Sequence, residues 1–375
     1  MRRRRNYEKE QTQRDGDVER LAWLLQTEKS DCVMWIGCGN ESLYRMSLLG
    51  DMYSFSELKE LKDVNPGKLQ KETISKYKFC RTGRDSGGTI YDKDNLELQQ
   101  EADDIHNQLK NCQISIPNIA NRLFFFKDME LSPIPHQLLL DERTDQFIGE
   151  NWPSANVIST EFLIKSNFND PLPQEYSKSY WSPAGMEGTF FGIKEHLNEL
   201  FVEYNFDVDV NDEPASPLHS DLNIICVHGN DNINDTEWFY AGHAPIVNSN
   251  KIVGPGKVLV LFVCHSGSMS YQHYDNSIHT IVKRYLKMGY SSVIAPMWSL
   301  NVDIIPIWLP VFMRVIDKEG FVVDAVHQAN MEVKKRFITP TAWACLHLFG
   351  NPYMKIAEKP ILYIEEDSDS FNQLA

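Results

Sequence analysis

The fold of this chain is decided by one apolar run, which reads VLVLFVC at residues 258–264. Its aliphatic and β-branched side chains do not alternate with polar ones, and this pattern is typical of a strand buried on both faces of a sheet. The run has the length of a strand and is far too short to cross a membrane. We therefore predict a buried strand whose last residue, Cys264, lies at the edge of a sheet.

Further elements follow from the patterns on both sides of this run. Residues 222–227 form a second apolar run, which leads into His228 and Gly229, and residues 292–296 form a third. Amphipathic spacing predicts helices at about 276–288, 303–317 and 321–336. Strands that alternate with helices in this way predict an α/β fold, with a mainly parallel central sheet that is flanked by helices on both faces.

Patterns in the first half of the chain are weaker. They predict strands at 32–36 and 122–126, a helical stretch at 138–140 and a helix at about 188–204. Residues 56–110 are mostly polar and are interpreted as weak helices and loops. Residues 151–188 carry several Pro, Gly and Ser residues and are interpreted as connecting loops.

Composition excludes some classes of function. The 375 residues carry a formal net charge of −15, and the one basic run is Arg2 to Arg5, so we expect no direct contact with nucleic acid. No apolar segment follows these arginines, so we expect no secretory signal and no contact with a membrane. The seven cysteines lack the spacing of zinc ligands and are typical of free thiols. We therefore expect a cytoplasmic protein without a metal or another cofactor.

His228 and Cys264 are the two residues with the clearest chemical potential. Both follow apolar strand runs, at the ends of strands where open α/β sheets bind their ligands. If the two strands are neighbours, the imidazole and the thiol lie within reach of each other, and a positioned imidazole makes a thiol nucleophilic. The N–H groups of Gly229 and Cys264 could then form an oxyanion hole. The alternative stays open, because a cysteine that ends a buried strand is more often a small core residue.

Other side chains near this run have competing interpretations. His265 follows Cys264 directly and could compete as a base, but an adjacent side chain is expected to point elsewhere. Ser266 lacks the glycine two residues before it that the GxSxG turn of a serine hydrolase requires. The tryptophans of the second half are most simply core aromatic residues; these are Trp298, Trp308 and Trp343.

Six blocks of sequence occur in a fixed order. They read LSPIPHQLL at 131–139, IICVHG at 224–229, VLVLFVC at 258–264, KMGYSSVIAPMW at 287–298, DAVHQA at 324–329 and TAWACLHLFGNP at 341–352. In this order they resemble the blocks of CHAT-domain proteases, which are caspase relatives in the clan that also holds separase, clostripain and gingipain. The resemblance covers about residues 115–375.

The resemblance implies a cysteine endopeptidase of caspase-like architecture. It assigns Cys264 as the nucleophile and His228 as the general base that passes its proton to the leaving amine. It also implies a preference for a basic residue before the scissile bond, read by an acidic side chain. Asp303 is our candidate for that pocket, although it could equally cap the following helix. The further candidates for substrate contact are Asp235, Glu237 and Trp298.

The same resemblance suggests how the chain is organised and used. It divides the chain into a basic and polar tail at 1–18, an N-terminal region at 19–114 and a protease domain at 115–375. The N-terminal region would either complete the sheet as a degenerate half or form a recognition element. Because many CHAT proteins act in bacterial defence, including antiviral defence, or in programmed death, a protein substrate and an activating sensor or partner protein are implied.

Two alternative functions remain. The first is a caspase-like scaffold or regulatory binding module without catalysis, although such a protein would have no chemical reason to keep a His/Cys pair. The second is an α/β hydrolase that acts on small esters, which the missing GxSxG turn disfavours.

Overall fold

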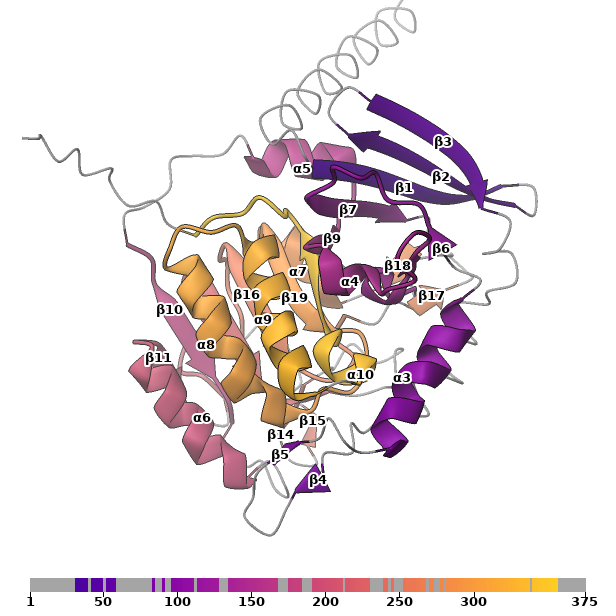
Figure 1. Cartoon of the computed structure of the whole chain (residues 1–375). Helices are drawn as coiled ribbons and strands as arrows, with labels where there is room; N and C mark the ends of the chain where they lie inside the picture. The colour runs from indigo at the N-terminus through magenta and orange to yellow at the C-terminus, as the bar shows by residue number, and fades with distance from the viewer. Residues whose placement is uncertain are drawn as a thin grey trace, which may run out of the picture.

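The centre of the molecule is a single sheet of eleven strands in the order β11-β10-β12-β16-β19-β20-β9-β7-β1-β2-β3 (Figure 1). The structure, a computed structural model, describes residues 31–39, 42–49, 52–58, 83–84, 90–91, 96–110, 113–127, 134–167, 175–183, 191–211, 213–229, 239–241, 244–245, 252–267, 270–272, 277–279, 281–337 and 339–356. The expected tail at 1–18 lies outside these residues.

One half of the sheet is parallel throughout. It consists of β11 (Asp207–Asp209), β10 (Lys178–Trp181), β12 (Leu222–Cys226), β16 (Val258–Phe262) and β19 (Ser292–Pro296). Every residue of the three strands β12, β16 and β19 is buried, which explains why their sequences are mainly apolar and do not alternate with polar residues. The prediction of a mainly parallel α/β sheet is therefore confirmed.

The direction of the strands reverses at the middle of the sheet. There β20 (Leu346–Gly350) pairs antiparallel with β19. Next to it, β9 (Ser154–Asn156), β7 (Arg122–Lys127) and β1 (Asp31–Gly39) run parallel to β20. The antiparallel strands β2 (Ser42–Leu49) and β3 (Met52–Leu58) complete this edge. Strands β1, β2 and β3 thus extend the sheet, whereas the domain boundary at residue 115 stays a prediction.

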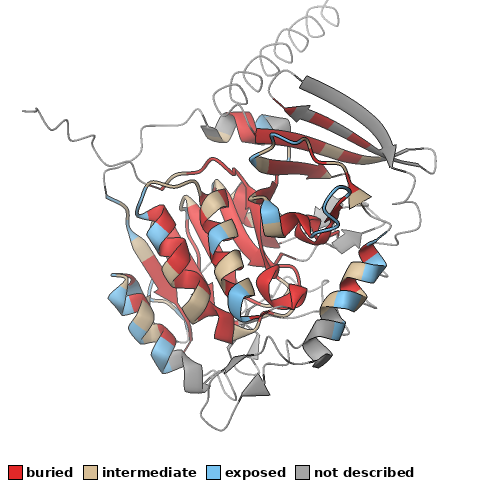
Figure 2. Cartoon of the chain, viewed as in Figure 1, coloured by how far each residue is buried: buried red, intermediate tan, exposed pale blue. Residues whose placement is uncertain are grey.

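Helices cover the parallel half on both faces. Figure 1 shows α6 (Phe191–Glu203), α8 (Ile305–Ile316) and α9 (Val322–Arg336) in front of the strands. The crossover β10-α6-β11 runs toward one edge of the sheet, and β16-α7-β19 runs toward the other. Because such crossovers are right-handed, α7 (Ile281–Lys287) lies on the face opposite α6. Figure 2 shows the central strands as buried and the outer surface of α6 as exposed.

The remaining described elements are short or peripheral. They are α3 (Leu96–Leu109), α4 (Ile148–Asn151), α5 (Thr160–Asn167), α10 (Pro340–Trp343), η5 (His136–Leu138), η8 (Val302–Ile304), β4 (Gly83–Arg84), β5 (Ile90–Tyr91), β6 (Gln113–Ile114), β8 (Leu140–Asp141), β13 (His228–Gly229), β14 (Phe239–Ala241), β15 (Ala244–Pro245), β17 (Ser270–Gln272) and β18 (Ser277–His279).

Three of the expected elements are wrong. The helical stretch at 138–140 is the end of a short 3-10 turn, η5, followed by β8, which pairs with β6. The loops expected at 151–188 contain α5 and two strands of the main sheet, β9 and β10. The helix expected from residue 276 begins at Ile281, because β18 precedes it. In the first two cases the strands pair with segments more than twenty residues away, whereas β18 forms a hairpin with β17, which is close in the sequence.

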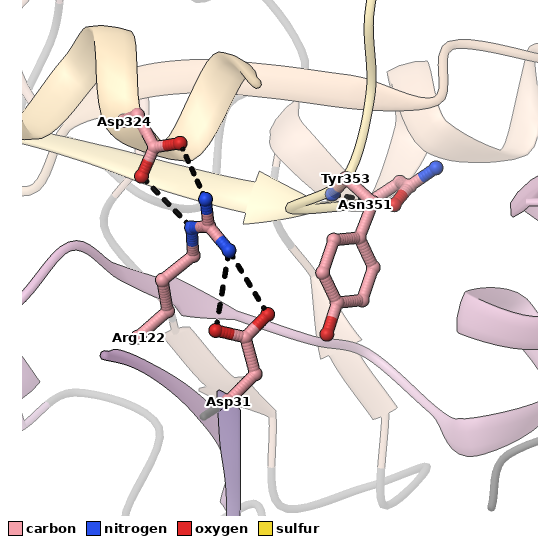
Figure 3. Close-up of polar contacts among 5 residues, drawn as sticks. All are labelled: Asp31, Arg122, Asp324, Asn351 and Tyr353. Carbon is pink, nitrogen blue, oxygen red and sulfur yellow. Dashed lines mark hydrogen bonds and ion pairs between the residues drawn. The ribbon is translucent and has the colours of Figure 1, made fainter. Parts of the chain in front are cut away.

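A charge cluster joins the N-terminal strands to a helix of the second half (Figure 3). The guanidinium of Arg122 on β7 donates from Nε and Nη2 to the two carboxylate oxygens of Asp324 on α9, each at 2.9 Å. Its Nη1 donates to both oxygens of Asp31 on β1 at 3.2 Å. Arg122 also lies 4.9 Å above the ring of Phe321. One side chain therefore connects three elements.

The same view shows the chain just after β20. The N–H of Tyr353 donates to the side-chain oxygen of Asn351 at 2.9 Å (Figure 3). The turn begins at Gly350, whose φ is +104° and where a Cβ atom would lie 2.4 Å from the carbonyl oxygen of Ser291. Only glycine fits this position without strain.

Candidate active site

The sheet brings His228 and Cys264 to the same edge. Strands β12 and β16 are parallel neighbours, and their register pairs Cys226 with Phe262. His228 and Cys264 each follow their paired residue by two positions. The backbone of His228 lies in β13, opposite Tyr240 of β14, while its side chain is outside the part that the structure describes.

Gly229 lies directly against the backbone of Cys264. A Cβ atom at this glycine would lie 2.0 Å from the carbonyl oxygen of Cys264 and 2.9 Å from its nitrogen. No real Cβ atom tolerates such distances from main-chain atoms, so any larger residue would push the two chain segments apart. The two N–H groups that the sequence assigned to an oxyanion hole are therefore close together.

The thiol of Cys264 lies among backbone groups. The N–H of Leu300 donates to its Sγ at 3.4 Å, and the carbonyl oxygen of Leu300 lies 4.0 Å from the same sulfur. Burial raises the pKa of the Cys264 thiol, while hydrogen bonds from the N–H groups of Leu300, Cys264 and Gly229 oppose this effect. Burial is the larger effect, so the thiol is protonated at neutral pH in this arrangement.

A tight turn follows the cysteine and ties it to the end of β19. His265 has a φ of +60°, which is rare for a residue with a side chain. Its N–H donates to the carbonyl oxygen of Trp298 at 3.1 Å, and its Nε2 contacts Oγ of Ser299 at 3.1 Å. The N–H of Gly267 donates to Pro296 at 2.8 Å. The ring of His265 is thus engaged with Ser299.

Trp298 packs into the core. Its side chain is buried, and its Nε1 donates to the carbonyl oxygen of Thr341 at 2.7 Å. Its ring packs edge-on against His347, with 5.7 Å between the ring centroids. This packing supports the interpretation of Trp298 as a core aromatic residue, and its assignment to substrate contact stays a prediction.

Asp303 is buried in the turn that precedes α8. The sequence left open whether this residue lines a pocket or caps the helix. The cap of η8 is Asn301, whose Oδ1 accepts the N–H of Asp303 at 3.0 Å, and α8 has no side-chain cap. Asp303 is therefore not the cap of either helix, and its role in binding a basic side chain stays a prediction. The other two candidates, Asp235 and Glu237, lie outside the described residues.

A buried polar cluster lies behind the site. His136 and His347 are fully buried, and their ring centroids are 5.2 Å apart. Burial lowers the pKa of His347 to about 3, with a further contribution from the charge of Lys127, and holds the pKa of His136 well below its usual range. Nδ1 of His136 lies 3.1 Å from Oδ1 of Asn156. Both imidazoles are therefore neutral at pH 7.

Two residues of the site had no counterpart in the sequence analysis. Leu300 reaches the sulfur through its backbone, and Ser299 holds the ring of His265. A backbone contact leaves no mark on residue type, so no sequence signal could have identified Leu300. Among the described residues, no cluster of three or more His, Cys, Asp or Glu side chains is arranged to hold a metal ion. No helix in the same residues has the length and apolar character needed to cross a membrane.

The fold is similar to that of two solved structures of the Saccharomyces cerevisiae separase–securin complex. The matches have TM-scores of 0.57 and 0.54 at 10% and 11% sequence identity, and each covers 89% of this chain. The chain spans 31% of the length of the matched chain in both. No protein-family model matches the sequence, and no curated protein is significantly similar to it. At this identity the likeness shows the fold alone, which is the caspase-like α/β fold.

Proposed function

We propose that this chain is a cysteine endopeptidase in which Cys264 is the nucleophile and His228 is the general base. The observation that carries the proposal is the contact of the Gly229 backbone with the Cys264 backbone at the ends of neighbouring strands, which brings the two candidate oxyanion donors close together. Among the described cysteines, Cys32, Cys226 and Cys345 are buried, whereas Cys264 is partly exposed. A cysteine that only fills the core would need neither the close contact with Gly229 nor the partial exposure.

The proposed reaction follows from this arrangement. The imidazole of His228 takes the proton of the thiol, and Sγ of Cys264 adds to the carbonyl carbon of the scissile peptide bond. The N–H groups of Gly229 and Cys264 stabilise the oxyanion. The C–N bond then breaks as His228 gives the proton to the leaving amine, which leaves a thioester on the enzyme. Water hydrolyses the thioester with His228 again as the base, and the thiol is restored.

The substrate and setting of the reaction rest on the sequence blocks that resemble CHAT-domain proteases. We propose a specific protein substrate that is cleaved after a basic residue, with Asp303, Asp235 and Glu237 as the candidates for recognition. An activating sensor or partner protein, a cytoplasmic location and a role in bacterial antiviral defence or cell death belong to the same proposal. The matched separase structures contain a protein partner, securin, which supports a protein-regulated activity only by analogy.

The test compares the wild-type chain with Cys264→Ala. Both are incubated with candidate protein partners and with peptide pools, and new termini are identified by mass spectrometry. Cys32→Ala, which makes the same chemical change on β1, is the matched control. Cleavage by the wild type and the control but not by Cys264→Ala supports the proposal. Equal cleavage in all three shows that the nucleophile is another residue.

The raised pKa of the Cys264 thiol favours one alternative, a caspase-like scaffold that binds a partner without catalysis. The same incubation separates the two functions. If the wild type cleaves nothing, even with an activating partner present, and still binds that partner as tightly as Cys264→Ala does, the scaffold function replaces the protease.

A further inference from the structure

The sulfur of Cys264 is engaged by the backbone of Leu300. The N–H of Leu300 donates to Sγ at 3.4 Å, and the carbonyl oxygen of the same residue lies 4.0 Å from Sγ. The proposed reaction needs this sulfur free to add to a carbonyl carbon. A sulfur that is held by Leu300 is not free in this way.

Leu300 also limits the access of a substrate to the sulfur. Leu300 is buried, with 8% of its surface exposed, and both its N–H and its carbonyl group face the sulfur. A substrate carbonyl has to approach the sulfur within about 3–3.5 Å before it can react. The atoms of Leu300 are at 3.4 and 4.0 Å from that sulfur, so they occupy part of this space.

A short stretch of chain holds Leu300 in place. We call residues 298–301 the latch segment. The Trp298 carbonyl oxygen accepts the N–H of His265 at 3.1 Å, and the side chain of Ser299 contacts Nε2 of His265, also at 3.1 Å. The thiol of Cys345 on the opposite side lies 3.8 Å from the carbonyl oxygen of Ser299. His265 follows β16 and Cys345 precedes β20, and these two strands are the neighbours of β19. The contacts therefore fix the latch segment over Cys264.

We propose that this arrangement is a resting state in which the latch segment covers the nucleophile and holds its sulfur through the backbone of Leu300. Release requires the latch segment to move away from Cys264, which frees the sulfur and makes room beside it for the carbonyl group of the substrate. The inference rests on the proposed protease function and names its regulated element. An activating partner would act by displacing residues 298–301.

The test measures how fast iodoacetamide alkylates Cys264 in the full chain without any substrate, by peptide mapping with mass spectrometry. Ser299→Ala removes the side-chain contact with His265, and Leu300→Gly removes the buried side chain that anchors the backbone of Leu300. Ser166→Ala is the matched control, because it removes a hydroxyl that donates to Leu163 on α5 at 3.2 Å. The rate for Cys264 is divided by the rate for the buried Cys226, so that general unfolding is not mistaken for release.

We expect this ratio to rise about threefold to tenfold in Ser299→Ala, as the loss of one hydrogen bond allows, and further in Leu300→Gly. It should not change in Ser166→Ala. An unchanged ratio in both latch variants overturns the proposal, including the case in which both thiols become more reactive together. If the ratio rises but no variant cleaves any protein, the latch stands and the protease function fails. If the wild type cleaves its substrate as fast as the latch variants do, the latch fails and the protease stands.

Discussion

Removing the guanidinium of Arg122 should destabilise the whole fold. The Arg122→Met variant keeps much of the volume of the side chain but leaves two carboxylates without their cation. The side chain of Asp31 is 1% exposed, so its charge has almost no access to water, whereas Asp324 is 21% exposed and can be partly hydrated. Loss of one partner of a buried ion pair costs about 3–5 kcal/mol. We expect a loss near the middle of this range, because one carboxylate is buried and the other is only half screened.

The assay is urea unfolding followed by circular dichroism at pH 7. Lys335→Met is the control, since it removes a cation from an exposed pair with Glu332, whose side chains are 69% and 31% exposed. Exposed pairs contribute about 0.2–1 kcal/mol, so this variant should unfold close to the wild type. The double variant Arg122→Met with Asp31→Asn should recover much of the stability, because it also removes the buried negative charge of Asp31. The reasoning is refuted if Arg122→Met loses no more stability than Lys335→Met does.

Three further predictions concern the site and the cluster behind it. Gly229→Ala should abolish Cys264-dependent cleavage and lower the urea midpoint, since its Cβ atom would lie 2.0 Å from a backbone oxygen; wild-type cleavage would contradict this. Stability should fall as the pH drops below 6.5, because the unfolded chain binds protons there while His347, with a pKa of about 3, stays neutral in the folded protein. His347→Gln should reduce this loss between pH 6.5 and 5 in urea titrations, and an unchanged slope would argue against it. Burial raises the pKa of Cys264, so its alkylation at pH 7 should be slower than that of a cysteine in an unstructured peptide and should rise as the pH increases; equal rates at pH 7 would be inconsistent with the raised pKa.

The strands that carry the site could be predicted because they are buried on both faces. Strands β12, β16 and β19 have only buried residues, so each appears in the sequence as an apolar run without alternation. Strand β9, with the sequence SAN, carries no such signal. Its residues are held in the sheet by pairing with β7 and β20, which are distant in the sequence. Short strands of this kind depend on their neighbours and not on their own composition.

The candidate site divides in the same way. The positions of His228 and Cys264 at the ends of apolar runs predicted that they meet at one edge of the sheet if their strands are neighbours, and the pairing of β12 with β16 supplies that condition. Gly229 was predicted as a donor to the oxyanion, whereas its contact with the backbone of Cys264 comes from the structure. The burial of Trp298 supports its interpretation as a core residue, and the sequence could not show this because residue type does not reveal which way a tryptophan packs.

The sequence by itself determined the class of fold and the pair of residues to examine, because apolar runs mark the buried strands and the ends of these runs mark where the strands end. The tertiary structure alone decided the state of the nucleophile. Leu300 lies 36 residues after Cys264, and the contact between them is made by a backbone N–H group that every residue except proline carries. Residue types therefore cannot encode it, and only the packing of β16 beside β19 brings the two together.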